Sequence, residues 1–232
     1  EIQALERLGW QVRRFAMRSD RAALVEPADL EEDRRTEHLL EAGGLRIGLS
    51  ALGWMAARPA AAVRALRLAL RAGARGAGGG PGTGGRLRHL IYLMEAAHLA
   101  RRCRAEGIRH LHAHFGTNSA TVAMLCATLG GPGYSFTTHG PEEFDAPLAL
   151  SLGDKIAAAR FAVAISSFGR SQLCRWVPPA LWPRIEVVPC GIEPQHFAPL
   201  PLPEAGPHLV AIGRLAPQKG FALLMEAVRL AA

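Results

Sequence analysis

Two cations late in the chain have the spacing of an anion-binding turn. Arg214 follows Gly213 directly, and Lys219 stands five residues later. An apolar series with helical spacing starts at Phe221 and predicts a helix that begins near Gly220. Because a helix N-terminus attracts negative charge, this turn predicts a site for an anion such as a diphosphate. The alternative is an ordinary strand-to-helix turn with two solvated cations.

Histidines mark the ends of two predicted strands, Ile108–His114 and Tyr134–Thr138. In the first strand they occupy alternate positions and therefore share one side of the sheet: His110, His112 and His114. His139 directly follows the second strand. Ligands of open α/β sheets bind at the carboxyl ends of the strands, so we expect the later histidines to line a cleft. The alternative for His139 is a turn residue bonded to backbone.

The loop after His139 carries three acids, Glu142, Glu143 and Asp145. We expect them either to bind hydroxyl groups of an acceptor or to form a solvated acidic loop. Alternating histidines on a strand also suit zinc. No acidic residue or cysteine stands close to these histidines in the sequence, so we expect no metal.

Strands and helices alternate along most of the chain, which predicts an α/β fold with a doubly wound parallel sheet. Two short apolar runs, Ile185–Val188 and Leu209–Ile212, predict buried parallel strands. Each run precedes a glycine-bearing turn, at Gly191 and at Gly213.

A proline-rich stretch at 199–207 separates these two runs. Proline has no N–H to give to a sheet, so the stretch predicts a linker between domains. We therefore expect a first Rossmann-like domain over 1–203 and the start of a second over 204–232.

Four segments resemble motifs of glycosyltransferase family 4, in that family's order. G-R-L-A-P-Q-K-G at 213–220 is similar to its G-R-L-x-x-x-K-G, and V-V-P-C-G-I-E-P-Q-H-F at 187–197 is similar to its V-x-P-N-G-V-D-x-x-x-F. H-A-H-F-G at 112–116 and T-T-H-G-P-E-E-F-D at 137–145 resemble the exopolysaccharide or colanic-acid branch. The resemblance runs from about Arg109 to the last residue.

The resemblance implies a GT-B fold, with the active site between two Rossmann-like domains. It implies retaining transfer of a sugar from a nucleotide-sugar donor, without a metal or other cofactor, to a saccharide or lipid-linked acceptor in cell-surface polysaccharide biosynthesis. It implies that His139 is catalytic and contacts the donor sugar. The donor-binding residues implied are Gly213, Arg214, Lys219, Gly191 and Glu193. Candidates for the acceptor or the cleft are His112, His114, Glu143 and Asp145.

The chain departs from the family pattern in two ways. Cys190 and Glu193 stand where the family has Asn and Asp, and no two glutamates stand eight apart, although the family has an E-x7-E pair. We expect that pair to lie beyond Ala232. A doubly wound domain begins with a strand and a glycine-rich turn, which are missing before Glu1. The chain therefore reads as a fragment cut at both ends, and we expect it to be inactive alone.

Positive charge is concentrated in one segment, Arg64–Arg104. It holds nine arginines and one acid, Glu95, so it carries 9 − 1 = +8, whereas the whole chain of 232 residues carries +7. Such a segment suits an anionic membrane surface. The alternatives are a solvated helix in an arginine-rich protein and a nucleic-acid site. Few aromatic residues lie among the arginines, so we expect no nucleic-acid partner.

Other patterns exclude several classes. Gly80-x-Gly82-x-x-Gly85 matches a dinucleotide fingerprint only formally, because no strand precedes it. The four cysteines form no C-x-x-C, and no signal peptide is visible, so we expect a cytoplasmic protein. The basic segment predicts a peripheral position on the inner face of the plasma membrane. Two other classes stay open: a non-catalytic nucleotide-binding module and a membrane-surface interaction protein.

Overall fold

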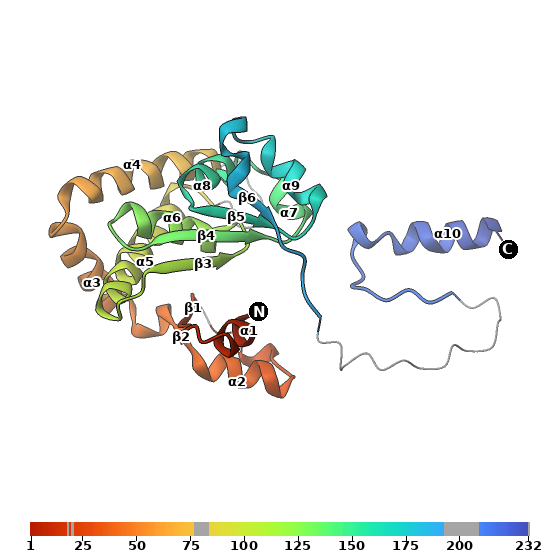
Figure 1. Ribbon diagram of the computed structural model, residues 1–232, viewed down its shortest axis with the longest axis horizontal. Coiled ribbons are helices and arrows are strands. Elements are labelled where there is room, and N and C mark those ends of the chain that lie inside the picture. Colours follow the sequence, from red (N-terminus) through yellow and green to blue (C-terminus); the bar gives the residue numbers. More distant parts are fainter. Residues whose placement is uncertain (18, 20, 77–83, 193–208, 232) are drawn as a thin grey trace. The chain divides into compact units, whose positions relative to one another are not determined.

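A computed structural model describes residues 1–17, 19, 21–76, 84–192 and 209–231 of the chain (Figure 1). It consists of two compact units, Glu1–Gly191 and Ile192–Ala232, which we describe separately. The domain boundary predicted at 203/204 lies outside the described residues and stays a prediction.

Four parallel strands form the main sheet of the first unit, and they lie side by side in the order of the sequence. Their bounds are β3 (His110–His114), β4 (Gly133–Thr138), β5 (Phe161–Ala164) and β6 (Ile185–Val187). The side chains of β4 are buried from Tyr134 to Thr138, as expected for a central strand with both faces covered. The predicted parallel α/β sheet is confirmed.

Helices connect consecutive strands of this sheet. They are α6 (Asn118–Thr128), α7 (Pro141–Asp145), α8 (Leu152–Ala158) and α9 (Ser167–Cys174), and the 3-10 turn η4 (Pro179–Arg184) precedes β6. Helix α6 buries seven consecutive residues, Ala120 to Cys126, because it packs between the sheet and further helices. It ends at Thr128, and Gly130 shortly after it has a φ of +85°, a left-handed conformation that suits glycine.

Three long helices form a second layer against α6. They are α3 (Gly44–Ala56), α4 (Pro59–Arg75) and α5 (Arg86–Ala105). Helix α5 packs on α3, α4 and α6 and is buried around most of its circumference. The Trp54 indole N–H of α3 donates to the Leu129 carbonyl at 3.1 Å, which fixes α3 to the end of α6. Within the described residues, no helix combines the length and apolar character needed to cross a membrane.

A small parallel sheet completes the first unit. Its elements, with two 3-10 turns, are α1 (Ile2–Arg7), β1 (Arg14–Ala16), η1 (Arg21–Ala23), α2 (Pro27–Arg35), β2 (Thr36–His38) and η2 (Leu39–Ala42). Charge holds these elements together: the buried Arg14 guanidinium bonds Glu6 at 2.8 Å and Glu32 at 2.6 Å. These hydrogen bonds raise the pKa of Arg14 and lower the pKa values of both carboxyls.

The second unit contains the 3-10 turn η6 (Pro217–Lys219) and the helix α10 (Phe221–Ala231). The helix expected near Gly220 is thus confirmed. The strand expected at Leu209–Ile212 is wrong: the segment is not a strand, and its apolar side chains are exposed, Ile212 by 93%. A strand needs a neighbour for its ladder of hydrogen bonds, and no described segment pairs with this one.

Candidate functional site

The alternating histidines of β3 lie against the neighbouring strand β4. In the parallel register His112 stands opposite Ser135, and His114 stands opposite Thr137. Ser135 Oγ lies 2.8 Å from His110 Nε2 and 2.7 Å from His112 Nδ1, while Thr137 Oγ1 lies 2.9 Å from His112 Nε2. The histidines therefore share one side of the sheet, as the alternation predicts.

The environment of His112 keeps its imidazole neutral. Both ring nitrogens are covered by hydroxyl groups although the residue as a whole is exposed. The loss of water around the ring lowers the pKa of His112 to about 4, and the neighbouring His114 is the second cause of this shift. Burial also lowers the pKa of His110, whose ring stacks on Phe161 with centroids 5.8 Å apart. At neutral pH this stretch of the sheet is polar but uncharged.

At the carboxyl ends of β3 and β4, His114 and His139 meet. His114 Nδ1 lies 3.2 Å from His139 Nε2, and the Phe115 ring lies 4.7 Å from the His139 ring. Phe115 has φ of +69°, a left-handed conformation that is rare outside glycine and typical of constrained functional loops. The structure therefore brings two of the predicted site residues, His114 and His139, into contact.

Glu143 is the residue that fixes the His139 loop. It is 1% exposed, and its carboxylate accepts hydrogen bonds from the backbone N–H groups of His139 at 2.6 Å and Gly140 at 3.1 Å. It also accepts from the N–H of Gly116, which follows β3. The carboxylate is thus bound to backbone, so the acceptor-binding role expected for Glu143 is replaced by a structural role. A carboxylate already bonded to three N–H groups in the interior is not available to a sugar hydroxyl.

Lys155 of α8 holds the other side of the same loop. Its side chain is buried, and Nζ donates to the carbonyl oxygens of Gly116 and Thr117, each at 2.7 Å. Burial lowers the pKa of Lys155 to about 7, although the nearby Glu143 carboxylate opposes the shift. Gly116 consequently bonds Glu143 through its N–H and Lys155 through its carbonyl.

Gly116 has no room for a side chain. A Cβ there would lie 3.0 Å from Glu143 Oε1 and 3.2 Å from Leu152 Cδ1. Because the Glu143 carboxylate is held by its other bonds, it cannot easily withdraw. The glycine of H-A-H-F-G is therefore required for the loop to approach Glu143 and Lys155.

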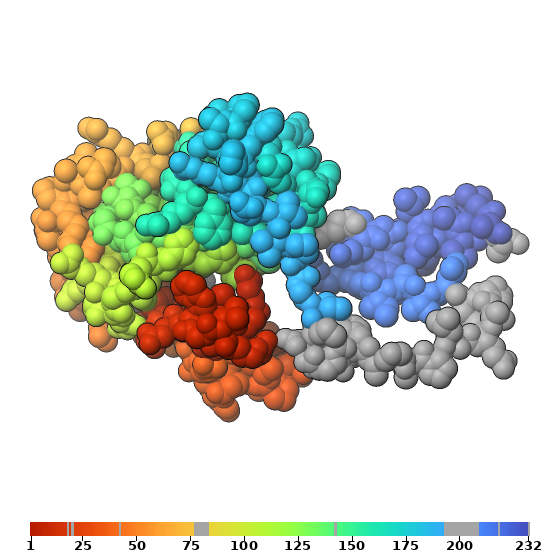
Figure 2. All heavy atoms as spheres, viewed as in Figure 1, coloured from red at the N-terminus to blue at the C-terminus, as the bar shows by residue number. Residues whose placement is uncertain are grey.

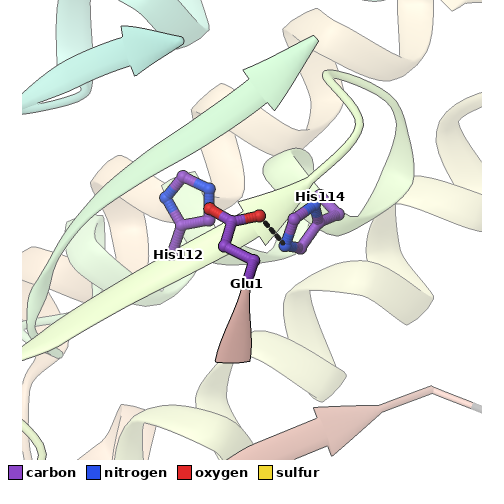
Figure 3. A group of neighbouring side chains, drawn as sticks. All are labelled: Glu1, His112 and His114. Carbon is purple, nitrogen blue, oxygen red and sulfur yellow. Dashed lines mark ion pairs between the residues drawn. The ribbon is translucent and has the colours of Figure 1, made fainter. Parts of the chain in front are cut away.

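A carboxylate also comes close to the histidines, contrary to the expectation from sequence. Ligand atoms of Glu1, His112 and His114 lie within 4.8 Å of one another, and Glu1 Oε2 is 3.6 Å from His114 Nε2 (Figure 3). Glu1 was missed because it stands far from these histidines in the sequence. Both His112 nitrogens already bond hydroxyl groups, so a metal would have to displace one of them. The absence of a metal stays a prediction.

The remaining expected residues are not joined to this cluster. Asp145 is exposed, and within the described part of the chain no hydrogen bond or ion pair links its carboxylate to His114 or His139. Gly191 is exposed at the end of the first unit. Glu193 lies outside the described residues.

The second unit holds the two cations in a turn built from local bonds. The Ala216 N–H donates to the Arg214 carbonyl and the Lys219 N–H donates to the Ala216 carbonyl, both at 2.9 Å. Gly220 has φ of +65°, which lets the turn pass into α10. Both cations are exposed, and among the described residues no carboxylate pairs with either of them.

A parallel α/β sheet with histidines clustered at the carboxyl ends of two adjacent strands defines a Rossmann-like protein with its candidate site at that edge. The Glycosyltransferase Family 4 model matches residues 2–196, most of the chain. The chain therefore belongs to glycosyltransferase family 4, and its parallel sheets and helices fit the Rossmann-like GT-B fold. A search of curated proteins and a search of solved structures each found no match.

The extent of this match differs from the expected resemblance. It begins at residue 2, well before Arg109, and it ends before the turn at 213–220. The family match thus covers the His139 cluster, whereas the assignment of Arg214 and Lys219 to the donor rests on their own motif.

Lys155 is the residue that the sequence did not reveal. It is the only lysine in the first 218 residues and stands in a helix of mixed composition, where a solvated lysine is the ordinary expectation. A buried position for it depends on carbonyl groups 38 and 39 residues away in the sequence.

Proposed function

We propose that this chain forms the acceptor-side domain and the first donor-binding turn of a retaining glycosyltransferase that uses a nucleotide-sugar. The observation that carries the proposal is the meeting of H-A-H-F-G and T-T-H-G-P-E-E-F-D at one end of the sheet. His114 and His139 are in contact there, and Glu143 bonds the backbone of both segments.

The chemistry assigned to this edge is recognition of the donor sugar by His139. The ring is half-buried, and Phe115 and His114 hold it from two sides. A donor sugar beside it would be shielded from water on one face while its anomeric carbon develops positive charge. A group held in place before the charge develops stabilises the transition state more than a mobile group does.

Departure of the nucleoside diphosphate is assigned to Arg214 and Lys219. Negative charge builds on the leaving diphosphate, so cations that contact it bind the transition state more strongly than the ground state. Both side chains are exposed and so are accessible to a phosphate. Gly213, Gly191 and Glu193 complete the proposed donor set.

The proposal includes an acceptor and a location. The acceptor is a saccharide or a lipid-linked saccharide of cell-surface polysaccharide synthesis, and His112 and Asp145 remain candidates for the cleft that receives it. The reaction retains the anomeric configuration and needs no metal or other cofactor. The enzyme works in the cytoplasm, on the inner face of the plasma membrane.

Titration calorimetry on the complete gene product tests the donor assignment. Arg214→Ala and Lys219→Ala are each expected to weaken UDP or GDP binding by about 1.5–3 kcal/mol, the magnitude of a charge-assisted hydrogen bond. Arg229→Ala is the matched control, because Arg229 is exposed on α10 and pairs with Glu226 at 2.7 Å. Unchanged affinity in both variants would refute the donor assignment.

Turnover separates an enzyme from a non-catalytic nucleotide-binding module. Sugar-nucleotide consumption by the complete gene product should fall in His139→Ala while nucleotide affinity is kept, and proton NMR of the product should show a retained anomeric configuration. Binding of nucleotide without turnover of any sugar nucleotide would support the module instead.

A further inference from the structure

We infer that the faces of α3, α4 and α5 that point away from the sheet form a docking surface for an anionic lipid bilayer. The inference deepens the membrane location in the proposed function. Its experiment uses no sugar nucleotide, so docking and catalysis can fail independently of each other.

Among the described residues of the first unit, these three helices carry an exposed apolar surface. Side chains on α3 are exposed at helical spacing: Leu45 by 80%, Leu49 by 63% and Leu52 by 57%. On α4 the exposed apolar series is Val63, Leu66 and Leu70, and on α5 it is Leu87 and Ile91. In Figure 2 the atoms of α3 and α4, coloured orange, form the left-hand surface of the first unit in that view.

A hollow joins the three faces. It has a volume of about 400 Å³, and all its lining residues are apolar. Side chains from each helix contribute to it: Met55, Val63, Leu66, Leu90, Leu93 and Met94. Exposed apolar surface that is continuous over several elements is a mark of an interaction site.

The charge around this surface has one sign. Between Glu41 and Glu95 the sequence contains eight arginines and neither aspartate nor glutamate. Three of the arginines are already engaged: Arg71 and Arg75 bond Asp154, and Arg58 lies over the Trp54 ring. The other five are exposed, and among the described residues none of them pairs with a carboxylate: Arg46, Arg64, Arg67, Arg86 and Arg88.

The free arginines flank the apolar stripes. At 100° per residue, Arg64 and Arg67 follow the stripe of Val63, Leu66 and Leu70 on the side of α4 opposite its buried alanines. Arg46 likewise borders the exposed leucines of α3, which lie on the side of that helix opposite its buried residues. An apolar face with cations at its border lies in the interface of a membrane, with arginine heads at the level of the phosphates.

The same charge pattern argues against a second copy of the chain as the occupant. In a two-fold dimer this surface would meet itself, so arginines would face arginines with no carboxylate from the segment to separate them. An anionic bilayer supplies both an apolar interior and the opposite charge. The basic surface differs from the segment Arg64–Arg104 expected from the sequence. Arg102 of that segment pairs with Glu37 and Glu106 and therefore does not belong to the surface.

Vesicle flotation of the 232-residue chain tests the inference. We expect it to float with phosphatidylcholine vesicles that contain phosphatidylglycerol, and to do so much less with phosphatidylcholine alone or in high salt. Each arginine near an anionic surface contributes about 1 kcal/mol. Arg64→Glu with Arg67→Glu should therefore lower the partition coefficient at least about tenfold. The control is Arg34→Glu with Arg175→Glu, which changes the net charge equally at two exposed positions, one in α2 and one directly after α9.

A second pair of variants tests the apolar contact. Leu49→Ser removes an exposed leucine from the surface, and Val25→Ser removes a valine that is 84% exposed elsewhere. Loss of one inserted leucine should lower partitioning about tenfold, also in high salt. Equal flotation with neutral vesicles, or unchanged partitioning in both test variants, would overturn the inference. A dimer in light scattering that Leu49→Ser dissociates would also overturn it, in favour of a second copy.

Discussion

Each of the two lysines of this chain lies at one of the two candidate sites, yet their surroundings differ completely. Lys155 is 1% exposed and bonds two carbonyl oxygens from a loop distant in sequence. Lys219 is exposed, and the bonds of its turn are all local. The loop at His139 is therefore set by tertiary packing, whereas the turn at 213–220 has its shape from its own backbone.

The two lysines therefore suit different roles: Lys155 can position a loop, and Lys219 can bind a ligand. A buried ammonium with both carbonyl partners in place is already satisfied and cannot serve a ligand, but it fixes the loops that do. An exposed ammonium contributes little to stability and remains available for a phosphate. The motifs in the sequence mark the places proposed to bind ligands, while Lys155, which holds one of these places in shape, belongs to no motif.

Replacing each lysine by methionine should give the largest contrast between the two regions. Lys155→Met removes the donor to Gly116 and Thr117 and the cation near Glu143, at nearly constant volume. We expect a loss of about 3–5 kcal/mol in the free energy of unfolding at pH 7, as for other broken buried charge networks. Lys219→Met should change it by less than about 0.5 kcal/mol.

Urea unfolding followed by tryptophan fluorescence measures this contrast. All four tryptophans lie in the first unit, so the signal reports the unit that contains Lys155. Equal stability of the two variants would mean that Lys155 does not hold the loop.

The sequence predicted the parts of the fold that depend on local pattern. A helix begins at Phe221, as the apolar spacing predicts, and the alternating histidines do share one side of β3. Helix α3 was missed because its glycines and its exposed leucines obscure the usual division into an apolar and a polar face. The segment Leu209–Ile212 has a strand's composition, but a strand also requires a partner.

The sequence predicted which residue types lie at the candidate site, but it did not predict what each of them contacts. His114 and His139 were expected at the ends of two strands, and they lie there in contact with each other, whereas their roles stay predictions. Glu143 was expected to bind an acceptor, yet it binds three backbone N–H groups. Whether a carboxylate faces a ligand or the interior depends on the path of the loop, which no local spacing encodes.

A smaller effect is expected from replacing Glu143 of the His139 loop, with Asp145 of the same loop as its control. Glu143→Gln replaces an acceptor-only carboxylate by an amide with one acceptor, so at least one backbone N–H loses its partner. The expected loss is about 1.5–3 kcal/mol, and the exposed Asp145→Asn should be neutral. Hydrogen exchange locates the effect: the amides of Gly116, His139 and Gly140 should exchange faster in Glu143→Gln only. Unchanged protection of these three amides would contradict the assigned bonds.

The smallest effect is a dependence on pH that belongs to Lys155. Its pKa is lowered to about 7 in the folded chain, against roughly 10.4 for an unfolded lysine. Below pH 7 both states hold the proton, and the buried charge costs stability. Above pH 7 the unfolded state holds a proton that the folded state has released, so stability rises with pH until the unfolded lysine also titrates.

Comparison with Lys155→Met isolates this contribution, because the variant keeps every other titrating group, including Glu143 and the nearby His89. The stability difference between the parent chain and Lys155→Met should grow by about 2 kcal/mol from pH 7 to pH 9, since one unit of pKa displacement corresponds to about 1.4 kcal/mol. Lys219→Met, which leaves Lys155 in place, is the control. Urea midpoints at the two pH values measure both differences. A difference that stays constant for Lys155→Met would mean that the buried lysine keeps its proton through this range, and that Glu143 and the two carbonyl groups outweigh its loss of hydration.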